Sequence, residues 1–165
     1  MRNGQVRWRL IWFRTLAGLK NMVYLLNAYL NATKGIDILN TTVDVKRAVR
    51  ESRVLNGLVT VMLPGSTAGV AVLENDAAIQ GELKKFIASL VPDPQGPRPS
   101  RKSGSGHAEA HLRAGFLARS VSIPVKDGKL LLGPWQEVLV FDFDDKVGRR
   151  EVCIHVMGEG AEKKV

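Results

Sequence analysis

Strand patterns dominate the last part of the chain and limit the folds that it can adopt. Asp127-Gly128 between two of these strands is typical of a type I′ hairpin turn, and residues 146–148 predict the last turn. Because the helix patterns lie earlier in the chain, we expect an α+β fold with antiparallel strand layers and flanking helices. The four predicted strands are 120–125, 129–132, 137–143 and 150–157.

Strand and helix patterns alternate in the first half of the chain. Thr41, with Asp44 three residues later, resembles a capping box and predicts a helix over 42–52, which ends before Gly57. Pro64-Gly65 predicts a turn between two apolar strands. The strands predicted in this half are 23–32, 58–63 and 68–73.

A second helix is expected after Asn75 and Asp76, which are both good N-cap residues. Pro92 ends it. Residues 92–106 hold four prolines and a Lys-Ser-Gly-Ser-Gly run, which predict a long surface loop. A third, short helix is expected over 107–119. The apolar stripe of the second helix recurs at helical spacing in Ile79, Leu83, Phe86, Ile87 and Leu90.

Positive charge is concentrated at the start of the chain. Five of the 24 lysines and arginines lie in residues 1–21, which hold no acid, so the remainder carries 19 basic against 16 acidic residues. The body lacks a basic stripe with interleaved aromatic residues, so we expect no nucleic-acid partner. No apolar run reaches the roughly 20 residues of a membrane-spanning helix. We therefore expect one domain at 22–165, preceded by a basic extension at 1–21.

That extension has two readings. It can lie outside the fold, as in a chain whose true start is Met22, or it can act as a membrane- or nucleic-acid-binding arm. The single cysteine, Cys153, excludes a disulfide within the chain and agrees with a cytoplasmic location. Because it lies in an apolar strand pattern, we expect an inert thiol.

Three polar places could carry chemistry, although the chain holds none of the common phosphate-loop, nucleophile-elbow or paired-cysteine motifs. Residues 64–69 place small side chains and hydroxyls at a turn, which suits an anion or simply a tight turn. His107 and His111 lie four residues apart on one face of the predicted helix, a spacing at which two histidines can bind one divalent metal ion. The same pattern is also typical of a helix face exposed to solvent. Trp135 and Gln136 can pack, or can stack on and orient a ligand.

These three places occur in the same order in the YjbQ family, the secondary thiamine-phosphate synthases, which the sequence resembles over about residues 23–160. The tract Leu131-Leu132-Gly133-Pro134-Trp135-Gln136 is the most telling single feature, although the specificity comes from the ordered set of motifs. The other matching segments are Pro64 to Ala68, Leu73-Glu74, Leu90 to Pro92, Ala110-His111-Leu112, Ile123-Pro124-Val125, Arg149-Arg150 and Gly158-Glu159.

The resemblance implies a YjbQ-like α+β domain that forms a homotrimer. It also implies a transferase that joins hydroxymethylpyrimidine diphosphate to thiazole phosphate, so a small phosphorylated ligand is expected. His111 and Glu74 would then be catalytic. Ser66, Thr67, Gln136 and Trp135 would bind substrate or anion, and His111 with His107 would hold any divalent metal.

The sequence also departs from the family pattern. The family's turn histidine falls on Gly65, its asparagine before the glutamate falls on Leu73, and its threonine before the tryptophan falls on Pro134. A Tyr-x-His tract expected after the second helix is missing from 93–106, where His107 could replace one lost histidine. Two readings stay open, an active thiamine-phosphate-synthase-type transferase and a non-catalytic trimeric binding or interaction paralogue, so whether the chain is an enzyme stays open too.

Overall fold

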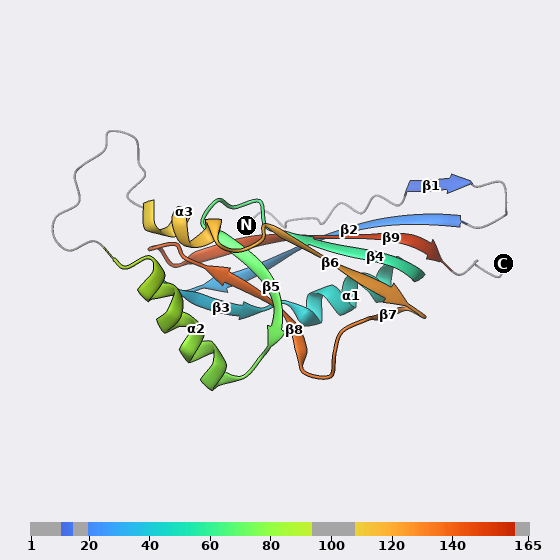
Figure 1. Ribbon diagram of the computed structural model, residues 1–165. Helices are drawn as coiled ribbons and strands as arrows, with labels where there is room; N and C mark the ends of the chain where they lie inside the picture. Colours follow the sequence, from blue (N-terminus) through green and yellow to red (C-terminus); the bar gives the residue numbers. More distant parts are fainter. Residues whose placement is uncertain (1–10, 15–19, 94–107, 161–165) are drawn as a thin grey trace.

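The computed structural model describes residues 11–14, 20–93 and 108–160, which form two antiparallel sheets and three helices (Figure 1). Sheet A has the order β1-β2-β9-β4-β6-β7, and sheet B the order β3-β8-β5. The strands of sheet A are Ile11–Arg14 (β1), Lys20–Ala32 (β2), Gly148–Gly160 (β9), Val54–Met62 (β4), Ser120–Lys126 (β6) and Lys129–Leu130 (β7). Those of sheet B are Asp37–Asn40 (β3), Gln136–Asp142 (β8) and Ala68–Glu74 (β5).

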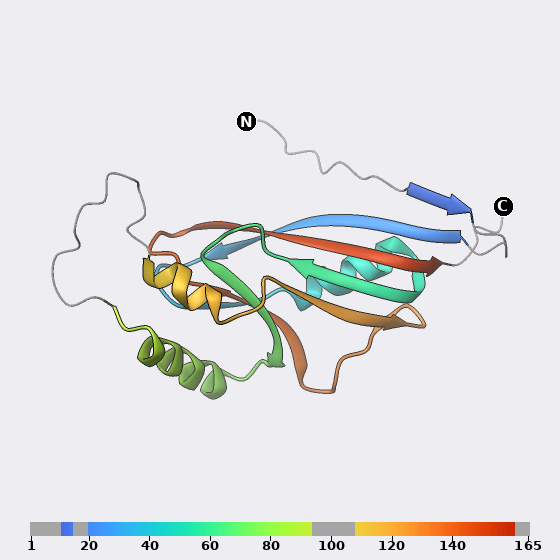
Figure 2. The ribbon, with the colours of Figure 1, turned by 45° about the horizontal axis from the view of Figure 1, so that its top comes forward.

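The main core lies between sheet A and a second layer made of sheet B and α1 (Thr42–Ser52) (Figures 1 and 2). Val45 and Val49 of α1 and Val138 and Val140 of β8 are all buried there. The alternate residues of β8, such as Phe141, face the other way, as the two-residue period of a strand requires. There they form a smaller core with α2 (Ala77–Leu90) and α3 (Ala108–Gly115).

The predicted fold class is confirmed, and so are several local features. The first helix has the predicted bounds, 42–52. Asp127 and Gly128 both have positive φ, as a type I′ turn between β6 and β7 requires. Asp76 caps α2 by accepting hydrogen bonds from the N–H groups of Ala78 (2.9 Å) and Ile79 (3.0 Å).

The predicted cap at Thr41 is wrong. Thr41 precedes α1 but its side chain accepts no capping hydrogen bond. The amide oxygen of Asn40 accepts from the N–H of Thr42 at 2.9 Å instead, and the Thr42 hydroxyl accepts from the N–H of Val138 at 2.8 Å. The hydroxyl of Thr42, the first residue of α1, thus serves sheet B as the acceptor that the buried N–H of Val138 requires.

Gly57 does not interrupt the chain as predicted, because it lies inside β4. A Cβ at this position would lie 2.2 Å from the carbonyl oxygen of Met157 in β9, so the glycine permits a close approach of two strands. The predicted helix over 107–119 is also shorter, and α3 ends at Gly115. The residues after it instead bond neighbouring strands: Ala118 accepts from the N–H of Val70 at 2.9 Å.

The late strands after the β6–β7 hairpin do not pair in sequence order, as a run of antiparallel hairpins would. β8 lies between β3 and β5 in sheet B, whereas β9 lies between β2 and β4 in sheet A. Residues 143–147 therefore carry the chain from one sheet to the other, and the turn predicted at 146–148 does not close a hairpin. The core explains this, because β8 and β9 bury valine faces against each other across the two layers.

Part of the predicted N-terminal extension pairs with the sheet. Residues 11–14 form β1, which runs antiparallel to the start of β2 from Ile11↔Val23 to Arg14↔Lys20. Most of the predicted loop at 92–106 lies outside the described residues. No described helix has both the length and the apolar composition needed to cross a membrane.

Candidate functional site

The turn Pro64-Gly65-Ser66-Thr67 carries the chain from the end of β4 in sheet A to the start of β5 in sheet B. It is anchored at both ends. Leu63 donates its N–H to the carbonyl of Arg119 at 3.0 Å, and the carbonyl of Thr67 accepts from the N–H of Phe143, also at 3.0 Å. Gly65 and Ser66 between these anchors are exposed.

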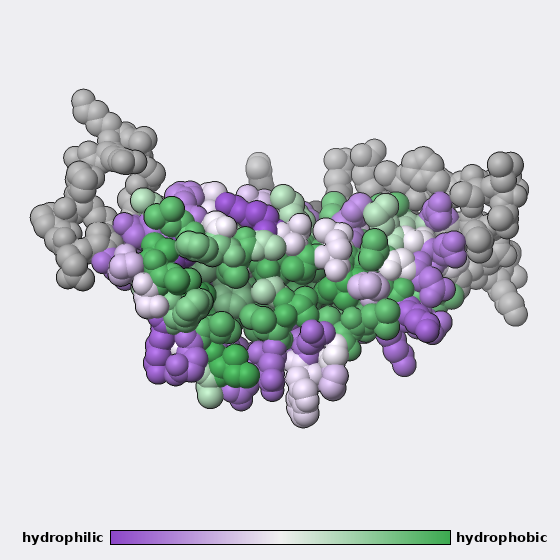
Figure 3. All heavy atoms as spheres, in the orientation of Figure 1, coloured by the Kyte–Doolittle hydropathy of each residue, from purple (hydrophilic) through white to green (hydrophobic). Residues whose placement is uncertain are grey.

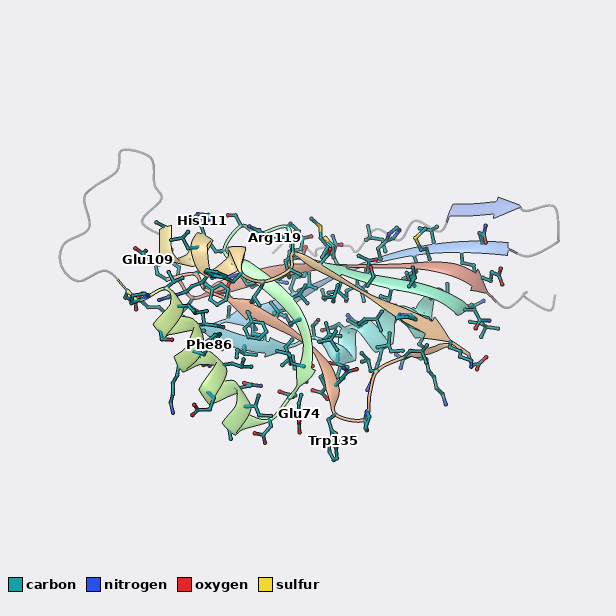
Figure 4. The ribbon with its side chains drawn as sticks, in the orientation of Figure 1. Glu74, Phe86, Glu109, His111, Arg119 and Trp135 are labelled. Atoms are coloured by element: carbon teal, nitrogen blue, oxygen red, sulfur yellow. The ribbon has the colours of Figure 1, made fainter. Side chains whose placement is uncertain are left out.

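Two basic side chains converge on this turn. The Nδ1 atom of His111, on α3, lies 3.2 Å from the carbonyl oxygen of Ser66. The guanidinium of Arg119 donates to the same oxygen at 3.1 Å and also to the carbonyl of Gly65. Figure 4 shows His111 and Arg119 at the same end of the molecule.

The chemistry of the acceptor defines the state of His111. A carbonyl oxygen only accepts, so Nδ1 must carry the proton, and in the neutral ring Nε2 is left as an acceptor. Within the described part of the chain, the hydroxyls of Ser66 and Thr67 have no hydrogen-bond partner. The turn thus gathers an imidazole, a guanidinium and two hydroxyls at one exposed place.

A buried ion pair lies behind the turn. Asp142, paired with Ala68 at the start of β5, is fully buried and accepts from Nε of Arg150 at 2.8 Å. Its second oxygen has no partner among the described residues. Burial raises the pKa of Asp142 despite the hydrogen bond from Arg150, and that hydrogen bond raises the pKa of Arg150.

The other end of β5 borders a cleft of about 780 Å³. Trp135, which is 72% exposed, stands at its mouth beside Glu74 (Figure 4). The side chain of Gln136 is used within the chain, because its amide oxygen accepts from the N–H of Gly133 at 2.8 Å. The remaining lining comes from Lys46 and Val49 of α1, from Asn75, Asp76 and Glu137, and from residues 128–130 and 132–134.

Charges of both signs line this cleft. The Glu137 carboxylate accepts from the side-chain amides of Asn40 and Asn75, and Asp76 is occupied as the cap of α2. Glu74 is exposed and has no hydrogen bond or ion pair with another described residue. The cleft therefore offers one free carboxylate and the flat face of one indole, and Lys46 and Lys129 also line it.

The predicted site residues fall into two groups. Ser66, Thr67 and His111 meet at the start of β5, whereas Glu74, Trp135 and Gln136 meet at its end, where Glu74 pairs with Gln136 across the strands. At about 3.3 Å per residue, the seven-residue strand between them spans roughly 20 Å. Sequence reasoning missed Arg119, because a lone arginine between a helix and a strand forms no motif.

The described residues contain no cluster of side chains suited to bind a metal ion. No three or more His, Cys, Asp or Glu side chains among residues 20–93 and 108–160 gather closely enough to hold one. His107, the second predicted ligand, lies outside the described residues. Cys153 is half-buried on β9, and burial, followed by the charge of Glu151, raises the pKa of its thiol, which agrees with the expected inertness.

Comparison with known proteins assigns the family. Residues 27–159 match the family described as "UPF0047 protein YjbQ-like". A UPF0047 protein of Archaeoglobus fulgidus is 37% identical over 123 residues, which cover 74% of this chain and 94% of that protein. A UPF0047 protein of Synechocystis is 33% identical and matched over 78% of this chain and 88% of its own length.

Solved structures agree with this assignment. A hypothetical protein from Aeropyrum pernix superposes with a TM-score of 0.73 at 30% identity, covering 82% of this chain and 98% of that one. A YbjQ-like protein of unknown function from Sulfolobus solfataricus has the same TM-score at 25% identity, covering 84% and 99%. The family match over residues 27–159 includes the turn at the start of β5 and the Trp135 tract, so this chain belongs to the YjbQ family.

Proposed function

We propose that this YjbQ-family protein binds a small phosphorylated ligand at the 64–67 turn, and that a single chain does not catalyse the transferase reaction. The convergence of His111 and Arg119 on the carbonyl of Ser66 carries the proposal. The charged guanidinium of Arg119 beside free hydroxyls suits a phosphate, which presents several acceptor oxygens at once. Neither basic side chain forms an ion pair with a described carboxylate that would compete with the ligand.

The separation of the two groups argues against catalysis within one chain. Joining a pyrimidine diphosphate to a thiazole requires the ring and the leaving diphosphate to be held together. Trp135 and Glu74, which suit a ring, lie roughly 20 Å from the turn along β5. A small molecule at one end of the strand cannot contact the other end.

A second candidate is the transferase itself, assembled as a homotrimer. In a closed ring of three copies, each interface joins two different patches, so the turn of one copy can meet the Trp135 cleft of the next. An exposed apolar face supports such an assembly. Hydrophobic side chains gather over α2 and β5 in Figure 3, and Ile79, Phe86 and Leu90 of α2 remain exposed, although Leu83 and Ile87 pack on the core.

Phosphate titration followed by amide chemical shifts tests the binding proposal. We expect shifts at residues 64–67, 111 and 119, and a weaker interaction in His111→Ala. Shifts spread evenly over the surface, or none at high phosphate, would contradict binding at the turn. Lys85→Ala is the control, because this exposed lysine on α2 forms an ion pair with Glu82 on the same helix and lies away from the turn.

An assay for thiamine phosphate from the two precursors separates the candidates. The binding proposal predicts no product above background at high protein concentration. Product that depends on His111, from a protein that light scattering shows to be trimeric, would favour the transferase. Product that persists unchanged in His111→Ala would contradict both candidates, since each relies on this side chain.

A further inference from the structure

The space at position 65 is open. A Cβ added to Gly65 would meet no atom within 4 Å, and the residue is not among those with positive φ. Neither crowding nor backbone conformation therefore requires a glycine here. The turn can accept the side chain that the family resemblance expects at this position, yet the chain has none.

Arg119 reaches this open place from a fixed backbone position. Its own carbonyl accepts from Leu63, and Ser120 after it pairs with Met62 at the end of β4. From this root the exposed guanidinium donates to the carbonyls of both Gly65 and Ser66. The positive charge is thus held against the turn at the residue that lacks a side chain.

The guanidinium keeps capacity for a ligand. It has five N–H groups, and the hydrogen bonds to the carbonyls of Gly65 and Ser66 leave others free, arranged in the planar fork that matches an oxyanion. His111 and the hydroxyls of Ser66 and Thr67 adjoin the same turn. No described carboxylate pairs with Arg119, so its charge is not neutralised within the described part of the chain.

We infer that Arg119 is the anion-recognition residue of this turn and supplies the charge that a histidine at position 65 would otherwise provide. The inference rests on the proposed binding function. It makes Arg119 a specificity-determining residue of this chain, since a permanently charged fork favours bidentate oxyanions such as phosphate or sulfate.

Sulfate titration of the full-length chain tests this inference, because sulfate keeps its charge across the working pH range. We expect Arg119→Gln to weaken sulfate binding about tenfold or more, as loss of a charge-assisted hydrogen bond implies. Arg119→Lys should retain part of the affinity. Arg50→Gln is the matched control, since this exposed arginine on α1 lies away from both the turn and the cleft.

A double variant separates recognition from support of the turn. Arg119→Gln combined with Gly65→His should regain sulfate binding at about pH 6, where an exposed imidazole is largely charged, and lose it near pH 8. Sulfate binding by Arg119→Gln with wild-type affinity would overturn the inference. So would a double variant that does not bind sulfate at either pH. Absence of sulfate binding by the wild type would instead overturn the proposed function, so the two failures are distinguishable.

If Arg119→Gln does not fold, the same titration of Arg119→Lys replaces it. Wild-type affinity for sulfate in Arg119→Lys would exclude a role for the planar guanidinium.

Discussion

The two ends of β5 differ in whether their polar groups have hydrogen-bond partners within the protein. At the turn end, polar groups are left open: the hydroxyls of Ser66 and Thr67 lack partners in the described structure, beside two basic side chains. At the cleft end, most polar groups are already used, because Gln136 closes its own turn and Glu137 accepts from two amides.

This difference separates support from recognition. Groups that satisfy one another hold the chain in place but have little left for a ligand, whereas unsatisfied exposed groups can exchange water for a ligand at small cost. By this measure the turn end is the better anion site. The cleft end offers mainly the face of Trp135 and the free carboxylate of Glu74.

Arg150→Met has the largest expected effect, and it acts behind the turn end. It leaves the Asp142 carboxylate buried without a cation, and breaking a buried pair in this way costs about 3–5 kcal/mol. Urea unfolding at neutral pH measures the loss. Arg149→Met is the matched control, because among the described residues its exposed guanidinium contacts only the ring of Tyr29, by a stacking worth about 1 kcal/mol or less.

The stability of the Arg150→Met variant should also depend on pH in a defined direction. Because burial raises the pKa of Asp142, the folded state holds this proton more tightly than the unfolded state, and stability falls as pH rises above the ordinary carboxyl value of about 4. Arg150 lowers that pKa, so its removal should extend the fall to higher pH. An equal loss of stability at about pH 5 and about pH 8 would contradict this account.

Gly69→Ala should disturb the turn end while sparing the cleft. A Cβ at Gly69 would lie 2.5 Å from Cβ of Leu117, so the segment leading to Arg119 must move, at a cost of about 1–3 kcal/mol. We expect weaker phosphate binding and unchanged chemical shifts around Trp135. Gly81→Ala is the control: position 81 has open space on α2, and the variant should gain up to about 1 kcal/mol in unfolding free energy.

The sequence predicts structural features that depend on residues close together in the chain. Its predictions fail where contacts with distant segments determine the structure. The α1 helix, the Asp76 cap and the Asp127-Gly128 turn are local, and each is confirmed. The cap at Thr41 fails where the chain joins sheet B: the Thr41 N–H donates to the carbonyl of Val138, far along the chain, and Asn40 accepts from the N–H of Thr42 instead. The hairpin expected before β9 fails for the same reason, since burial of valine faces in two layers outweighs pairing in sequence order.

The candidate site was half predictable. Motif order identified Ser66, Thr67 and His111, which do meet, and Glu74 with Gln136, which also meet. It could not reveal that the length of β5 separates the groups, because order along a chain carries no distance. Nor could it find Arg119, whose importance comes only from the strand pairing that aims it at the turn.

Gln136→Met should have a smaller effect than the first two changes, confined to the cleft end. It removes the acceptor of the Gly133 N–H at similar side-chain size, which costs about 1 kcal/mol. Urea unfolding gives the loss, and phosphate binding at the turn should be unchanged. Gln136→Glu keeps an acceptor oxygen and should be closer to the wild type; equal losses in both variants would show that this hydrogen bond is not the cause.

Trp135→Ala should have the smallest effect on stability, within about 0.5 kcal/mol, because the indole is largely exposed. Its value lies in testing whether the two ends are independent. Changes at separate sites add, so combining Trp135→Ala with Arg119→Gln should leave the effect of each on sulfate affinity unchanged within about twofold. A larger coupling would show that the two ends, which lie roughly 20 Å apart in one chain, are not independent. It would favour an assembly in which the turn of one copy meets the cleft of another, and so the assembled transferase over the binding protein.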